Sequence, residues 1–240
     1  PSSERAQPIG TLPMPRVAPR SSLGTPTTPA RGQHVTTQET TAPEAQVDVE
    51  ALNRRWMLPT LIEMLVCGLI GLTASFVLSI EAWEGAKNAG ETFSCDLNAT
   101  FSCSTVAHSW QATLLGFPNA FFGILFEAVV LTVTVALLLG ARMPRSFMLL
   151  INVFYTVAIL FALWLFTQSF FVIHALCPWC LTITVTTTLV FAGLTRINIR
   201  TGALPSSDGL WDFVSRGRDW WVWGGLLVLL ALAVTFKYLV

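Results

Sequence analysis

The sequence predicts an all-α membrane protein with five transmembrane helices. Hydrophobic residues make up 53% of the 240 residues and charged residues only 12%, whereas about a quarter of the residues of soluble domains are charged. Five apolar runs have close to the roughly 20 residues that a helix needs to cross a bilayer. The formal net charge is zero, so the chain lacks the basic surface that binds nucleic acid.

The apolar runs divide the chain into segments. They lie at about 57–80, 117–140, 147–173, 178–195 and 220–239, and each is predicted to be a helix in the lipid bilayer. Residues 1–50 contain eight of the thirteen prolines and few side chains to bury, which predicts a disordered cytoplasmic tail. The predicted domains are this tail, a four-helix domain over 51–200, and a cytoplasmic linker with the fifth helix over 201–240.

The arginines predict the orientation of the helices. They precede the first apolar run, separate the second from the third, and separate the fourth from the fifth: Arg54, Arg55, Arg142, Arg145, Arg196, Arg200, Arg216 and Arg218. Cytoplasmic loops are enriched in Arg and Lys, so we expect a multi-pass cell-membrane protein with its N-terminus inside and its C-terminus outside. The loop 81–115 and the segment 174–178 then face the exoplasmic side.

Four of the five cysteines form two pairs on the outer side. Cys177 and Cys180 are a C-x-x-C motif at a helix start, where Pro178 suits the first helical position. The positive end of the helix dipole stabilises a thiolate, which favours a redox-active pair over a static bridge. Cys95 and Cys103 lie in the long outer loop. They fit either a static disulfide or a shuttle that exchanges with the first pair.

Other residues with ligating or ionisable side chains are assigned more simply. The spacings C-x7-C and C-x-x-C are not those of paired zinc knuckles, so no metal is expected. Cys67, inside the first apolar run, is predicted to be an inert packing residue. Glu63 and Glu127 also lie in apolar runs, where carboxylates are costly and are candidates for function. Glu63 is close enough to Arg54 to reach the cytoplasmic interface, whereas the sequence assigns Glu127 no role.

This pattern resembles the vitamin K epoxide reductase family. The resemblance is carried by the C-x7-C loop, Ser109, the stretch GFPNAFFG over 116–123, and the CPWC motif, and it extends over about 57–200. In that family a four-helix bundle surrounds a quinone, the C-x-x-C contacts it, and the loop pair exchanges with an external thioredoxin-like protein. The resemblance implies a thiol:quinone oxidoreductase of the bacterial five-span type without a fused thioredoxin domain, which supports disulfide bond formation in exported proteins.

The resemblance also implies an order for the cysteines. Cys180 would face the quinone with Cys177 as its partner, Cys103 would relay to Cys177, and Cys95 would meet the external protein. The quinone would be of the menaquinone, ubiquinone or vitamin K type. The thiol donor would be a separate thioredoxin-like or DsbA-like protein, and the chain would lie in the inner membrane.

The implied quinone site contains Asn119, Ser109, Phe121 and Phe122. Asn119 matches a quinone-contacting asparagine, and the residues alone favour a helix cap at that position. Ser109 matches a loop serine near the active site, with a solvated hydroxyl as the alternative, and the two phenylalanines are expected to form apolar walls. Thr184 stands where vertebrate members have tyrosine, which leaves epoxide reduction unsupported.

Two other functions remain open from the sequence. A DsbB-type quinone-linked thiol oxidase would carry its C-x-x-C in the first outer loop, whereas here the motif begins the fourth apolar run. A non-enzymatic membrane protein with two structural disulfides is the other possibility. Structural disulfides have reduction potentials below about −300 mV, so a redox titration separates that possibility from a catalytic role.

Overall fold

The computed structural model describes residues 42–88 and 92–238. Its long helices are α1 (Ala42–Lys87), α3 (Ala120–Leu138), α4 (Arg145–Gln168), α5 (Pro178–Arg200) and α7 (Asp219–Tyr238). Each contains a segment long and apolar enough to cross a membrane, which confirms the predicted all-α membrane protein. The expected disordered tail lies mostly outside the described residues, although α1 already begins at Ala42.

Short elements connect the long helices. The loop after α1 contains α2 (Cys103–Ala107) and the 3-10 turn η1 (Trp110–Thr113), and α4 ends in a π-helical turn, η2 (Ser169–Ile173). Helix α6 (Asp208–Ser215) lies between α5 and α7. Thus the segments that carry the two cysteine pairs and the GFPNAFFG stretch connect the long helices or begin them.

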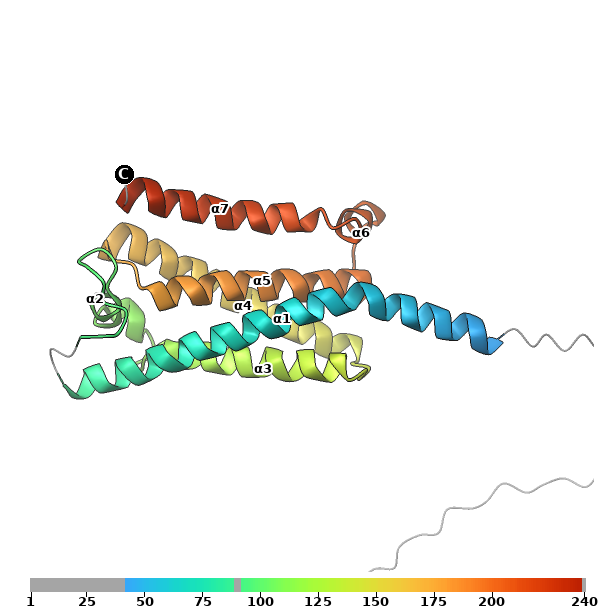
Figure 1. Cartoon of the computed structure of the whole chain (residues 1–240), viewed down its shortest axis with the longest axis horizontal. Coiled ribbons are helices and arrows are strands. Elements are labelled where there is room, and N and C mark those ends of the chain that lie inside the picture. Colours follow the sequence, from blue (N-terminus) through green and yellow to red (C-terminus); the bar gives the residue numbers. More distant parts are fainter. Residues whose placement is uncertain (1–41, 89–91, 239–240) are drawn as a thin grey trace, which may run out of the picture. The chain divides into compact units, whose positions relative to one another are not determined.

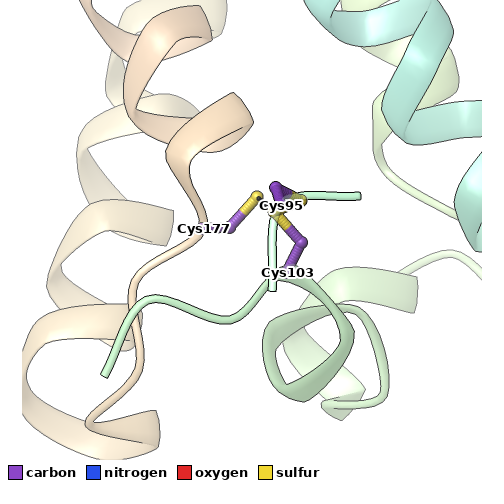
Figure 2. A group of neighbouring side chains, drawn as sticks. All are labelled: Cys95, Cys103 and Cys177. Carbon is purple, nitrogen blue, oxygen red and sulfur yellow. Dashed lines mark hydrogen bonds between the residues drawn. A yellow bond between two sulfur atoms is a disulfide. The ribbon is translucent and has the colours of Figure 1, made fainter. Parts of the chain in front are cut away.

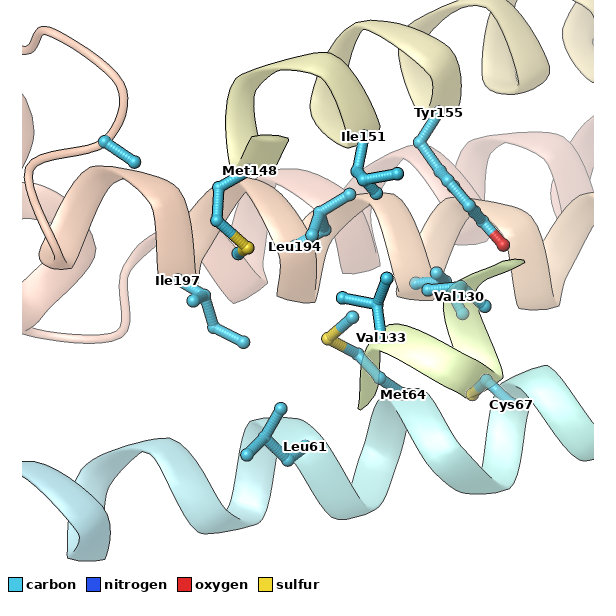
Figure 3. Close-up of a cluster of buried hydrophobic side chains, with 12 residues drawn as sticks. Leu61, Met64, Cys67, Val130, Val133, Met148, Ile151, Tyr155, Leu194 and Ile197 are labelled. Atoms are coloured by element: carbon cyan, nitrogen blue, oxygen red, sulfur yellow. The ribbon is translucent and has the colours of Figure 1, made fainter. Parts of the chain in front are cut away.

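Helices α1, α3, α4 and α5 pack together as a bundle (Figure 1). Their apolar runs meet in one core, to which α1 contributes Met64, α3 Val130, α4 Tyr155 and α5 Leu194, each fully buried (Figure 3). Large aliphatic side chains on the outside of the bundle are exposed: Leu69, Leu125, Leu150 and Val153. An apolar interior with an apolar exterior suits a bundle surrounded by lipid rather than by water.

Helix α7 runs along one side of the bundle and contacts α5 (Figure 1). At its start, Asp219 forms an ion pair with Arg196 of α5 at 2.9 Å. At its other end, Lys237 and Tyr238 both donate hydrogen bonds to the carbonyl of Phe170 in η2. The last four carbonyls of a helix have no partner within it, and Phe170 is among them, so α7 stabilises the end of this helix close to the C-x-x-C motif.

Candidate functional site

The structure brings the two cysteine pairs into contact at one end of the bundle. Cys95 and Cys103 form a disulfide with Cα atoms 5.7 Å apart, and Cys177 and Cys180 are free thiols. The Sγ atom of Cys177 lies 2.9 Å from the Sγ atom of Cys103, and the two side chains point toward one another (Figure 2). A thiol therefore lies next to a disulfide sulfur, as thiol–disulfide exchange requires.

Backbone hydrogen bonds hold the two segments together. Phe101 and Leu176 form a parallel β-bridge. Phe101 lies two residues before Cys103, and Leu176 lies directly before Cys177. The N–H of Ser102 donates to the carbonyl of Leu176 at 3.0 Å, and the N–H of Leu176 donates to the carbonyl of Thr100 at 2.8 Å. These bonds fix the register of the loop against the start of α5.

The local structure at the start of α5 places the C-x-x-C motif. Cys177 is the N-cap residue, with extended backbone angles, and Pro178 occupies the first helical turn. The N–H of Cys180 donates to Cys177 Sγ at 3.3 Å. This bond is the N-cap contact of α5, so the sequence-based placement of this pair at a helix N-terminus is correct.

A carboxylate organises the loop disulfide. Asp96 accepts hydrogen bonds from the N–H of Phe93 at 2.8 Å, the N–H of Ser104 at 3.0 Å and the hydroxyl of Ser102 at 2.9 Å. Partial burial alone would raise the pKa of Asp96, but these hydrogen bonds outweigh it and lower the pKa from 3.8 to about 2. Asp96 is therefore ionised at neutral pH and links both ends of the Cys95–Cys103 loop.

A cavity opens beside the cysteines at this end of the bundle. Its walls come from the outer loop and from α1, α3, α4 and α5, and three sulfurs line it, those of Cys103, Cys177 and Cys180. The remaining walls are largely apolar, with aromatic rings from Phe122, Phe126, Phe161 and Phe166. A large apolar cavity with a few polar groups is typical of a site for a small organic molecule.

Asn119 lines this cavity and does not act as a helix cap. It occupies the N-cap position of α3 without a capping hydrogen bond, and instead its Nδ2 donates to the carbonyl of Gln111 at 2.6 Å. Its Oδ1 atom is buried and has no hydrogen-bond partner among the described residues. A buried acceptor without a partner is costly, so this atom is available to a ligand. The capping interpretation favoured by the residues alone is wrong.

The other predicted wall residues divide between the cavity and the outside. Ser109 and Phe122 line the cavity, and the Ser109 hydroxyl donates to the carbonyl of Val106 at 2.6 Å. Phe121 is not among the lining residues; it is 39% exposed and packs against Phe117. Successive residues of a helix point about 100° apart. Phe122 therefore faces the cavity and Phe121 does not, so the wall position expected for Phe121 is wrong.

Glu127 is part of the cavity wall, a position that the sequence did not indicate. This residue of α3 lines the cavity and is only 1% exposed, and the hydroxyl of Tyr155 on α4 lies 3.4 Å from its Oε2 atom. The signal was a carboxylate inside an apolar run. The run alone did not indicate which side of α3 faces the cavity.

His174 and His108, which flank the cysteines in sequence, are exposed and do not line the cavity.

Three sulfur atoms also lie close enough to bind a metal ion. Those of Cys95, Cys103 and Cys177 lie within 4.8 Å of one another. Two of them are joined in the disulfide, and metals bind thiolates. The geometry thus supports exchange between sulfurs.

Comparison with known proteins agrees with this site. Residues 62–195 match the family model described as the vitamin K epoxide reductase family, and this range contains both cysteine pairs and the cavity. A search of curated proteins finds no match to the chain. Because the family model covers more than half of the 240 residues, the chain belongs to the vitamin K epoxide reductase family.

Proposed function

We propose that this chain oxidises the thiols of a separate thioredoxin-like protein and passes the electrons through its two cysteine pairs to a membrane quinone. Membership of the family makes it a quinone-linked thiol oxidoreductase in general. The single observation that carries the proposed route is the 2.9 Å contact between Cys177 Sγ and Cys103 Sγ at the edge of the cavity. The route supports disulfide formation in exported proteins.

The relay has a defined order of bond changes. A thiolate of the partner attacks Cys95, and the partner's second thiol completes its own disulfide, leaving Cys95 and Cys103 as thiols. Cys103 then attacks Cys177 in the Cys177–Cys180 disulfide, and Cys95 attacks Cys103, which restores the loop disulfide and leaves two thiols in the inner pair. The oxidation state of the cysteines in the structure matches the end of this step.

The inner pair then reduces the quinone in the cavity. Cys180 lines the cavity together with Asn119 and Phe122, which supports their roles as electron donor, polar contact and apolar wall. The partnerless Oδ1 atom of Asn119 accepts a hydrogen bond from a hydroxyl of the reduced quinone. As the S–S bond of Cys177–Cys180 forms, two electrons reduce the quinone to the quinol.

The four cysteines are not equivalent in this relay, and the test uses that difference. Cys180→Ala should abolish quinone reduction with every donor and accumulate a Cys103–Cys177 disulfide, because exchange stops at the mixed disulfide. Cys95→Ala should lose the protein donor but retain turnover with dithiothreitol, which is small enough to reduce the inner pair directly. Leu97→Ala, a 71% exposed neighbour in the same loop, is the matched control and should retain turnover with both donors.

Quinone reduction is followed by absorbance with each donor in turn. Dithiothreitol-driven turnover by Cys180→Ala, or full activity of Cys95→Ala with a reduced thioredoxin-like protein, would show that electrons take another route.

A further inference from the structure

The quinone cavity contains one buried carboxyl group that the cysteine relay does not use. Among the described residues that line the cavity, Glu127 is the only one besides the cysteines with a readily titratable side chain. Thr184 and Thr187 of α5, which also line it, have hydroxyl groups that do not titrate near neutral pH. Reduction of a quinone adds a proton to each of its two oxygens, so a proton donor in this cavity has a function.

The surroundings of Glu127 favour its neutral, protonated form. The side chain is 1% exposed and lies within a membrane-spanning helix, where an ionised carboxylate costs several kcal/mol. Its partner is the hydroxyl of Tyr155, and within the described part of the chain no ion pair joins it to Lys or Arg. A neutral carboxylic acid in a cavity wall can donate a proton to a ligand.

The depth of Glu127 fits a bound ring that touches Cys180. A Cβ atom added to Gly71 would meet Glu127 Oε1 at 2.5 Å and Thr186 Oγ1 at 2.8 Å, so Glu127 and Thr186 lie at one level of the bundle. Thr186 is six residues after Cys180 on α5, a rise of about 9 Å. A quinone ring bound between these levels has one oxygen toward Cys180 and the other toward Glu127.

Polar groups continue from Glu127 toward the end of the bundle opposite the cysteines. Glu127 Oε2 lies 3.5 Å from the position that a Cβ of Gly68 on α1 would occupy, and the preceding residue, Cys67, is buried. The thiol of Cys67 donates to Oε1 of Glu63 at 3.8 Å. Glu63 precedes Cys67 by one helical turn on α1. The other oxygen of Glu63, Oε2, is buried and has no hydrogen-bond partner among the described residues.

Glu63 in turn lies near the ion pair at the far end of α5. Its Oε2 atom is 3.1 Å from the position that a Cβ of Gly193 would occupy. Arg196, one turn further along α5, pairs with Asp219 at the start of α7. Arg196 is sixteen residues from Cys180, about 24 Å along the helix. The track Glu127–Cys67–Glu63 therefore leads from the cavity toward the opposite membrane face.

We infer that Glu127 protonates the quinone and is itself reprotonated along this track from the membrane face opposite the cysteines, so that the chain moves protons across the membrane. The inference rests on the proposed quinone reduction. In each turnover the Cys177–Cys180 dithiol closes to a disulfide and gives two electrons to the quinone. One quinone oxygen takes a proton from the dithiol and the other takes one from Glu127. The second dithiol proton leaves on the cysteine side, and Glu127 regains its proton from the opposite side.

The test measures the side from which protons are taken. The full chain is reconstituted in vesicles that contain a short-chain menaquinone, a pH-sensitive dye inside, and valinomycin with K⁺ to remove the membrane potential. A phosphine reductant that does not cross the membrane activates only molecules whose cysteines face outward. The wild type should take up about one interior proton per quinone reduced. Glu84→Gln, which alters an exposed carboxyl group on α1, the helix that carries Glu63, is the matched control and should behave identically to the wild type.

The variants separate a proton path from a structural role. Glu127→Gln keeps the shape and should lower turnover tenfold or more, since a general acid contributes about 10²- to 10⁴-fold, and its residual turnover should take up no interior protons. Glu127→Asp should restore part of both. Glu63→Gln, outside the cavity, should leave quinone binding unchanged and slow interior proton uptake at least tenfold.

Two results would contradict proton uptake through Glu127. Wild-type quinone reduction without interior proton uptake, or full turnover and uptake by Glu127→Gln, would overturn the inference and leave the cysteine relay intact. No quinone reduction by the wild type with either donor would instead refute the proposed function itself.

Discussion

Replacing Asp96 tests how the loop disulfide is held in place. Asp96→Ala removes three hydrogen bonds, from the N–H groups of Phe93 and Ser104 and from the hydroxyl of Ser102. These bonds join the residues that flank Cys95 to those that flank Cys103. Their loss should let the loop segment open far more often while the bundle remains folded.

The magnitude follows from the number and exposure of these bonds. A net contribution of about 0.5–1.5 kcal/mol per hydrogen bond gives about 1.5–4.5 kcal/mol for three. The loop is partly exposed, so the released N–H groups find water, and we expect about 2 kcal/mol, or roughly 30-fold in the opening equilibrium. Asp96→Asn keeps the Oδ1 atom that serves Ser102 and Ser104 and loses only the bond to Phe93. It should cost about 1 kcal/mol, roughly fivefold.

The pH dependence has a definite sign. The pKa of Asp96 is lowered in the folded state from 3.8 to about 2, so its stabilisation is complete above the ordinary value and is lost as the pH falls through about 2. The difference between wild type and Asp96→Ala should thus be constant from pH 5 to pH 8. A difference that grows or disappears within that range would contradict the assignment.

Hydrogen exchange read by mass spectrometry over residues 92–104 measures the opening equilibrium. Asp208→Ala, which removes an exposed carboxylate at the start of α6, controls for the loss of charge and should leave exchange in the loop unchanged. Equal exchange in wild type and Asp96→Ala, or equal losses in the Ala and Asn variants, would refute the reasoning from three bonds.

Three further predictions concern the cavity, the fifth helix and the topology. Asn119→Ala should raise the Michaelis constant for quinone about two- to tenfold through one lost hydrogen bond, and unchanged kinetics would remove Asn119 from the site. Lys237→Met should weaken the contact of α7 with η2 and increase the alkylation rate of Cys177 severalfold; an unchanged rate would show that this contact does not stabilise the motif. An impermeant maleimide applied to intact cells should label a cysteine introduced at Thr92 but not one at Arg142, and the reverse pattern would invert the topology.

The sequence predicted the membrane helices better than their ends. The expected fourth run, 178–195, stops where arginines begin, whereas α5 continues to Arg200. Hydropathy could not show this extension, because it depends on tertiary partners for the charged side chains. Arg196 pairs with Asp219, and the guanidinium of Arg200 lies 3.8 Å from the ring centre of Trp56. Apolar length fixes where a helix crosses the bilayer, but packing determines where it ends.

The sequence indicated which residues of the candidate site meet, but not how the fold brings them together. The motif and its family resemblance identified the residues that meet at Cys103 and Cys177. The bridge between Phe101 and Leu176 that brings them together has no periodic signal, because it joins two irregular segments 75 residues apart. Glu127 was visible as a carboxylate in an apolar run, but its partner Tyr155 depends on the register of α3 against α4.

The same bridge determines which end of the loop disulfide is free to travel. Ser102, just before Cys103, is tied by its backbone to Leu176, whereas the N–H of Ser94, just before Cys95, donates to the side chain of Glu81. An opened disulfide therefore releases Cys95 outward and leaves Cys103 beside Cys177. Both of these inner residues are at most 2% exposed, so a folded protein cannot touch them directly. Cys95 is itself only 7% exposed, so in the proposed relay a protein donor reacts only after this end of the loop opens, while the bridge keeps Cys103 in place.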